Sequence, residues 1–168
     1  MDCLKALRIA LACLALVLPV TLWQAVAAAE SDQSLDLEAY YGKVVVVDFW
    51  ASWCVPCRRS FPWLDAMQQK YGDAGLVIIG INEDNVAEDA EAFLTNFPVS
   101  FRILLDPGGE LAKEFDVVAM PSTYVIGRDG EIAARHLGFK TAKRDEYETT
   151  LKRLLGGDPL PATGADSE

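Results

Sequence analysis

Two patterns of apolar residues alternate along most of the chain, and they predict strands and helices in turn. Residues 43–50, KVVVVDFW, form a β-branched and aromatic run without alternation. Such a run predicts a strand buried on both faces, and therefore central and parallel. Residues 76–82, LVIIGIN, predict a second buried strand. Between the two strands, apolar residues recur at spacings of three and four over 54–71, which predicts a helix that Gly72 ends.

The pattern continues to the end of the domain. It predicts a helix over 86–97, a short strand over 101–106, a short helix over 110–115, a hairpin of strands over 122–127 and 131–137, and a closing helix over 142–155. The order β-α-β-α-β-α-β-β-α predicts an α/β fold with helices on both faces of a sheet that ends in an antiparallel hairpin. We expect this domain to span residues 30–156, and the polar residues 157–168 to form a disordered tail.

The first 29 residues do not fit this domain. Lys5 and Arg8 precede an apolar run from Ile9 to Val20, and small residues then lead to the polar Glu30. This pattern predicts a secretory signal peptide over residues 1–29 that is cleaved after Ala29. An uncleaved membrane anchor is the alternative, because the apolar stretch is long enough to span a bilayer.

Composition and charge narrow the chemistry. The 168 residues carry a net charge of −10 and show no basic stripe, so nucleic acid is not an expected partner. Cleavage of the signal peptide would remove Cys3 and Cys13 and leave only Cys54 and Cys57. A lone pair of thiols in an exported protein favours a role outside the reducing cytosol, in the periplasm or another extracytoplasmic space.

The two remaining cysteines lie in the stretch DFWASWCVPC, residues 48–57. Residues three apart on a helix have Cβ atoms about 5–6 Å apart, near enough for a disulfide. We expect Cys54 at the helix N-terminus, where unpaired N–H groups and partial positive charge stabilise a thiolate. Cys54 is therefore the predicted nucleophile, and Cys57 is predicted to resolve the mixed disulfide.

Other uses of the pair have less support in the sequence. A structural zinc site needs about four ligands, and the mature chain offers two cysteines and His136. A structural disulfide would constrain only a short loop. A peroxidase would want a Thr-rich turn and an activating Arg before Cys54. A chaperone for copper or zinc that uses the two thiolates stays open as an alternative. We expect no cofactor and no resident metal.

FWASWCVPC resembles the active site of the thioredoxin superfamily. The wider pattern, GKVVVVDFWASWCVPC followed by MPSTYVIGRDGEI, resembles the exported TlpA/ResA/DsbE-like thiol–disulfide oxidoreductases over roughly residues 35–155. The resemblance implies a thioredoxin fold with an extra helix and strand, for which residues 84–105 supply the length. It also implies cysteine-containing protein substrates, a membrane electron donor, a monomer, and a reductase activity that in relatives often serves cytochrome c assembly.

Several residues acquire expected roles from this resemblance. Trp53 and Met120 are expected to contact the substrate, and Pro121 is expected to be the cis-proline beside the active site. Pro62 matches the proline that kinks the active-site helix in thioredoxins. Many relatives carry a Glu where this chain has Ser60.

Asp48 is the only charge in its apolar run. Burial should raise the pKa of its carboxyl group, because the ionised form loses hydration. We expect the following helix to bring Cys57 close to Asp48, so that the carboxylate can accept the thiol proton during resolution. Many relatives have Asn at this position, whereas thioredoxin has Asp.

The remaining polar residues are expected to be structural or solvated. Arg58 and Arg59 predict an exposed helix face, with attraction of an anionic partner as the alternative. The acidic run from Glu83 to Glu91 predicts a solvated face, with a docking patch as the alternative. His136 is expected at the surface, or with its hydrogen bonds satisfied, near the end of its strand.

Overall fold

The computed structural model describes residues 34–156. Its elements follow the predicted order β-α-β-α-β-α-β-β-α, with two short 3₁₀ helices in addition. They are η2 (Glu38–Tyr40), β1 (Val44–Trp50), α2 (Cys57–Tyr71), β2 (Leu76–Asn82), α3 (Ala87–Asn96), β3 (Arg102–Leu105), α4 (Glu110–Glu114), β4 (Ser122–Ile126), β5 (Ile132–Leu137), η3 (Thr141–Lys143) and α5 (Arg144–Gly156).

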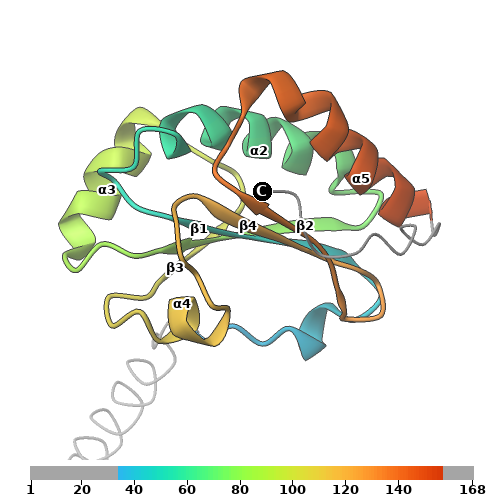
Figure 1. Ribbon diagram of the computed structural model, residues 1–168, viewed down its shortest axis with the longest axis horizontal. Helices are drawn as coiled ribbons and strands as arrows, with labels where there is room; N and C mark the ends of the chain where they lie inside the picture. Colours follow the sequence, from blue (N-terminus) through green and yellow to red (C-terminus); the bar gives the residue numbers. More distant parts are fainter. Residues whose placement is uncertain (1–33, 157–168) are drawn as a thin grey trace, which may run out of the picture. The chain divides into compact units, whose positions relative to one another are not determined.

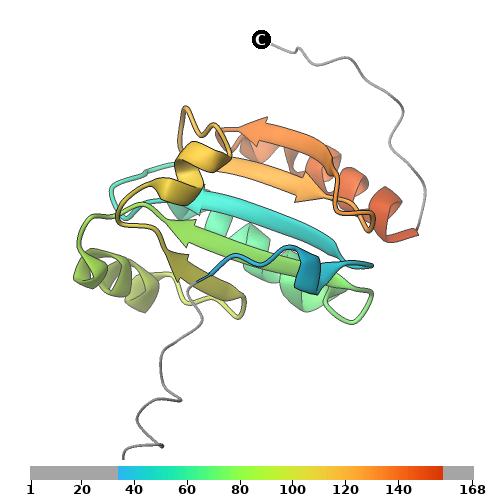
Figure 2. The ribbon, with the colours of Figure 1, turned by 90° about the horizontal axis from the view of Figure 1, so that it is seen from below.

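The five strands form one mixed sheet in the order β3-β2-β1-β4-β5 (Figure 2). β1 runs parallel to β2 and antiparallel to β4, and β5 returns antiparallel to β4. All seven residues of β1 are buried, so the prediction of a central strand buried on both faces is confirmed. Its expected parallel pairing holds on the β2 side only, because β4 follows a crossover that reverses its direction.

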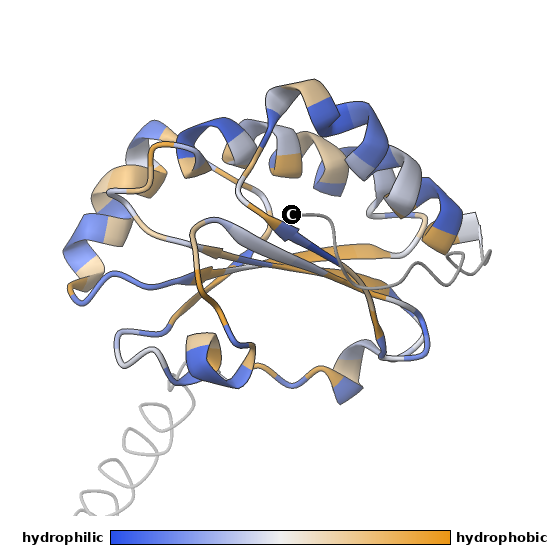
Figure 3. Ribbon diagram, viewed as in Figure 1, coloured by the Kyte–Doolittle hydropathy of each residue, from blue (hydrophilic) through white to orange (hydrophobic). Residues whose placement is uncertain are grey.

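Helices cover both faces of the sheet (Figure 1). α2, α3 and α5 lie on one face, and α4 and η2 lie on the other. Successive residues of β1 point to opposite faces. Val44, Val46 and Trp50 accordingly pack in the core beneath α2, whereas Val45, Val47 and Phe49 pack in the core beside α4. The apolar sides of the helices face the sheet, and their polar sides face outward (Figure 3).

The inserted segment is also as predicted. Residues 84–105 contain α3 and β3, and β3 adds an edge strand parallel to β2. The predicted signal peptide (1–29) and tail (157–168) lie outside the described residues. Within residues 34–156, no helix has the length and apolar character to cross a membrane.

Candidate active site

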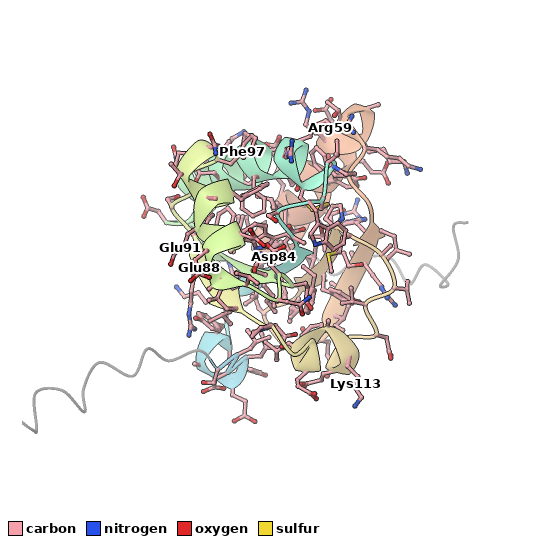
Figure 4. The ribbon with its side chains drawn as sticks, turned by 90° about the vertical axis from the view of Figure 1, so that its left-hand side faces the viewer. Arg59, Asp84, Glu88, Glu91, Phe97 and Lys113 are labelled. Carbon is pink, nitrogen blue, oxygen red and sulfur yellow. A yellow bond between two sulfur atoms is a disulfide. The ribbon has the colours of Figure 1, made fainter. Side chains whose placement is uncertain are left out.

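A disulfide joins Cys54 and Cys57 in the connection between β1 and α2, with the two Cα atoms 5.3 Å apart. Figure 4 looks onto the edge of the sheet where this connection lies, and the yellow sulfur–sulfur bond is visible there. The expected pairing of the two cysteines is therefore present in the structure.

The helix begins later than expected. α2 starts at Cys57 rather than at Cys54, with Pro56 as its N-cap residue. The Cys54 N–H donates to the carbonyl of Ala51 at 3.0 Å, and the Cys57 N–H donates to the carbonyl of Cys54 at 3.2 Å. These bonds span three residues and close turns, which apolar spacing alone cannot distinguish from the first turn of a helix.

The later start of α2 does not change the electrostatic surroundings predicted for Cys54. The backbone N–H of Cys57, the first residue of α2, lies 3.3 Å from Sγ of Cys54. The free N–H groups at a helix start carry partial positive charge. The Cys54 sulfur thus faces the end of the helix that stabilises a thiolate.

The surroundings of the two sulfurs differ. Cys57 is fully buried and Cys54 is 3% exposed, whereas the neighbouring Trp53 and Val55 are 65% and 58% exposed. The buried hydroxyl of Ser60 donates to the Cys57 carbonyl at 3.2 Å. Ser60 therefore supports the first turn of α2 and offers no acid–base group in place of the relatives' Glu.

The peptide bond between Met120 and Pro121 is cis, as the resemblance implied. It immediately precedes β4, and Met120 packs against the apolar core that includes both cysteines. Pro62 lies inside α2, where it removes one backbone N–H.

Asp48 is fully buried on the face of β1 that α2 covers. The hydroxyl of Thr123 donates to its Oδ1 atom at 2.6 Å, and its Oδ2 atom has no hydrogen-bond partner among residues 34–156. Burial raises the pKa of the carboxyl group to about 7, and the bond from Thr123 opposes the rise only in part. The predicted upward shift of this pKa is confirmed.

Asp84 is a residue whose role the sequence reasoning missed. It is 5% exposed, so the expectation of a solvated side chain was wrong for this position. Its carboxylate accepts hydrogen bonds from the N–H of Ser52 at 2.9 Å, from the Ser52 hydroxyl at 3.0 Å and from Nδ2 of Asn82 at 2.8 Å. Asp84 thereby ties the loop before Cys54 to the end of β2.

A signal for this contact was present in the order of the strands. β1 and β2 are parallel, and Trp50 is the register partner of Asn82. The residues that follow the two strands therefore meet at one edge of the sheet. In Figure 4, Asp84 lies inside the molecule, whereas Glu88 and Glu91 lie on the outer side of α3.

The rest of the acidic run divides into two kinds of residue. Glu88, Asp89 and Glu91 are exposed, as expected. Glu83 is partly buried, and its pKa rises to about 8, chiefly through burial and secondarily through the adjacent carboxylate of Asp106. The pair Arg58 and Arg59 is exposed, as expected of a solvated helix face.

His136 lies near the end of β5, as expected, but the expectation of a surface or hydrogen-bonded side chain was wrong. It is half-buried on β5, and within the described part of the chain its Nε2 atom is buried without a hydrogen-bond partner. Its ring lies against the ring of Tyr147 on α5, with centroids 4.6 Å apart. Burial lowers the pKa of His136.

Comparison with known proteins agrees with this geometry. The Redoxin family model matches residues 19–151. The chain belongs to the Redoxin family. It is 28% identical to the thiol-disulfide oxidoreductase ResA of Bacillus thuringiensis subsp. konkukian. The alignment of 122 residues covers 73% of this chain and 69% of the relative. The chain is 31% identical to the thioredoxin-like protein YneN of Bacillus subtilis, which covers 72% of each chain.

A solved structure shows the same fold. The crystal structure of a protein assigned as thiol:disulfide interchange protein DsbE from Chlorobium tepidum superimposes with a TM-score of 0.71 at 38% identity, and covers 73% of this chain and 86% of that one. The thioredoxin fold and the ResA/DsbE-like resemblance are thus confirmed. The chain is a thiol–disulfide oxidoreductase that acts on cysteine-containing proteins.

Proposed function

We propose that this protein is an exported reductase of disulfides in partner proteins. The observation that carries the proposal is the Cys54–Cys57 pair at the start of α2, where the Cys57 N–H lies 3.3 Å from the Cys54 sulfur. A stabilised thiolate at Cys54 makes the dithiol reactive toward disulfides at neutral pH. Members of the family that the sequence resembles often keep partner cysteines reduced, which supports this direction of electron flow.

In the reduced protein, the Cys54 thiolate attacks a disulfide of the partner. The partner's S–S bond breaks, one partner sulfur leaves as a thiolate, and Cys54 is left in a mixed disulfide. Cys57 then attacks the Cys54 sulfur, the second partner sulfur leaves with the electron pair, and the Cys54–Cys57 bond forms. A membrane electron donor then reduces the Cys54–Cys57 disulfide back to two thiols. The protein is proposed to work as a monomer.

Asp48 is the proposed acid–base group of the resolving step. Asp48 and Cys57 both belong to the layer between β1 and α2. A carboxyl group with a pKa of about 7 is half ionised at neutral pH, so it can accept the thiol proton of Cys57 and later return it. No other titratable side chain is fully buried in that layer among residues 34–156.

The substrate is proposed to bind over the exposed Trp53 and beside the cis peptide of Met120 and Pro121. An extended partner strand could pair there with the backbone that leads into β4, as peptides do at free sheet edges. The exposed Val55 would add apolar contact next to the reacting sulfur.

The site of action is proposed from the signal-like N-terminus and the relatives. Cleavage after Ala29 would release the domain to the periplasm or another extracytoplasmic space. Apocytochrome c is one candidate partner, because relatives of this kind often serve cytochrome c assembly.

The test is the reduction potential of the Cys54–Cys57 couple against glutathione and against a dithiol buffer. A strongly reducing potential supports the reductase. A potential as high as that of an oxidase or isomerase, about −180 to −120 mV, would assign the opposite direction of electron flow.

A further inference from the structure

Three polar side chains form a row across the sheet. Asp48 on β1 is the register partner of Thr123 on β4, and Thr123 is the register partner of His136 on β5. Register partners in neighbouring strands point to the same face of a sheet. The row therefore lies on the face that α2 and α5 cover, and it crosses from the central strand to the edge strand.

Each end of this row carries an unpaired polar atom. Oδ2 of Asp48 and Nε2 of His136 are both buried, and neither has a hydrogen-bond partner within residues 34–156. Buried polar atoms of native proteins are normally bonded to protein or to water, because an unpaired one has lost its hydration without a replacement partner.

A cavity of about 20 Å³ lies between α2, α5 and strands β4 and β5, and Thr123 and His136 are in its wall. Ser60 supplies a third polar group, and apolar side chains such as Trp63 and Leu151 form much of the remainder. A polar cavity larger than roughly 10–15 Å³ accommodates one water, which needs two to four polar partners. The volume of this cavity exceeds that limit, and Thr123, His136 and Ser60 place three polar side chains in a wall that is otherwise mostly apolar.

We propose that one water in this cavity connects Thr123 to His136, and that protons pass between Asp48 and solvent through Thr123, this water and His136. The inference rests on the proposed acid–base role of Asp48 and adds the route by which that buried group exchanges its proton. His136 is then a positioning residue, which acts on the reaction through Asp48.

The transfer balances without any change in oxidation state. As Cys57 attacks the mixed disulfide, its thiol proton moves to the Asp48 carboxylate. The protonated carboxyl group then passes a proton to Oγ1 of Thr123, the Thr123 hydroxyl passes its own to the water, and the water passes one to Nε2 of His136. His136, half-buried at the edge strand, then releases a proton to solvent. The same transfers in reverse bring a proton from solvent back to the Asp48 carboxylate.

The charges around His136 are compatible with a transient proton. Burial lowers the pKa of His136, the carboxylate of Glu146 raises it, and the ammonium group of Lys143 lowers it. Tyr147 contributes an aromatic face. Burial raises the pKa of Asp48 to about 7, so its carboxyl group can both accept and release a proton near neutral pH. Burial lowers the pKa of His136, which favours release of a proton from the imidazole.

The experiment compares steady-state reduction of insulin by the full mature protein in dilute buffer and in concentrated imidazole buffer. His136→Ala removes the ring and leaves room for imidazole. We expect it to lower turnover by about 3- to 10-fold in dilute buffer, and imidazole to restore most of the loss. His136→Gln, which fills more of the space, is expected to show the same loss with little rescue.

Two further variants separate the relay from a structural effect. Thr123→Val keeps the shape of Thr123 without its hydroxyl, so turnover should fall and imidazole should not restore it. Arg135→Ala changes the neighbouring residue on β5, whose side chain lies over Tyr124, and should turn over like the wild type. In an Asp48→Asn background, His136→Ala should cause no further loss, because the two act in one route.

Wild-type turnover of His136→Ala in dilute buffer would overturn the relay. So would a loss that imidazole leaves unchanged in His136→Ala, or a further loss in the Asp48→Asn background. An inactive wild-type protein would instead overturn the proposed function, so the two failures are distinguishable.

Discussion

The carboxylate of Asp84 holds Ser52 by two hydrogen bonds, one from its backbone N–H at 2.9 Å and one from its hydroxyl at 3.0 Å. Ser52 lies two residues before Cys54, and Asp84 lies just after β2. The contact therefore fixes the active-site loop to the rigid end of a buried strand.

Asp84→Ala should loosen this loop, because the Ser52 N–H and the Asn82 amide lose a buried acceptor. We expect a loss of about 2–4 kcal/mol in the free energy of unfolding, measured by urea denaturation. Hydrogen exchange at the Ser52 amide should also become faster. Glu88→Ala changes an exposed acid on α3 and is the control, with an expected effect within about 0.5 kcal/mol. Equal stability of the two variants would show that the hydrogen bonds of Asp84 contribute nothing to the free energy of unfolding.

Asp48→Asn should slow insulin reduction at neutral pH by about 10-fold or more, because an amide cannot accept the Cys57 proton. The amide oxygen can still accept the bond from Thr123, so the fold should be kept. Turnover that matches the wild type across roughly pH 6–9 would leave Asp48 as a structural residue only.

Asp48 should also make stability depend on pH. Its pKa is about 7 in the folded protein against 3.8 for an unperturbed Asp, so the folded state binds the proton more tightly. The contribution of Asp48 to the free energy of unfolding is therefore fully present below about pH 4. It is lost as the pH rises through 7, and the loss is a few kcal/mol at most. Asp48→Asn should remove this loss, as the free energy of unfolding against pH would show. An unchanged slope between about pH 4 and 7 would contradict the raised pKa.

Glu83 should extend the same dependence to higher pH. Its folded pKa of about 8 lies above the ordinary 4.5, so its contribution to stability is also lost as pH rises, through a window that ends about one unit above that of Asp48. Glu83→Gln should flatten the dependence of the melting temperature on pH between about pH 7 and 8, whereas the exposed Glu88→Gln should not. If both variants retain the wild-type slope, Glu83 titrates normally.

Cys57→Ser should trap partner proteins as mixed disulfides on Cys54, because no resolving thiol remains. Cys54 should also be alkylated faster than Cys57 in the reduced protein near neutral pH, since its sulfur faces the N–H of Cys57. Mass spectrometry of trapped complexes and of alkylated peptides measures both effects. Better trapping by Cys54→Ser would reverse the two roles.

The sequence by itself determined the order and type of the elements and the chemistry of the cysteine pair. The run of four valines in β1 needs apolar neighbours on both faces, and only a central strand provides them. The burial of Asp48 was expected from the same run, because the residues on both sides of it are apolar. The spacing of Cys54 and Cys57 is local, so the possibility of a disulfide could be inferred without the fold.

Tertiary structure decided which distant side chains bond to each other, although the β-α-β order already placed the ends of β1 and β2 at one edge of the sheet. Asp84 reaches Ser52, and Asp48, Thr123 and His136 form a row, because strand pairing brings together positions far apart in the chain. Apolar periodicity reports which face of an element is buried, but it carries no information on register between strands. The start of α2 at Cys57 was likewise beyond the pattern, because turns before a helix and its first turn place apolar residues at similar spacings.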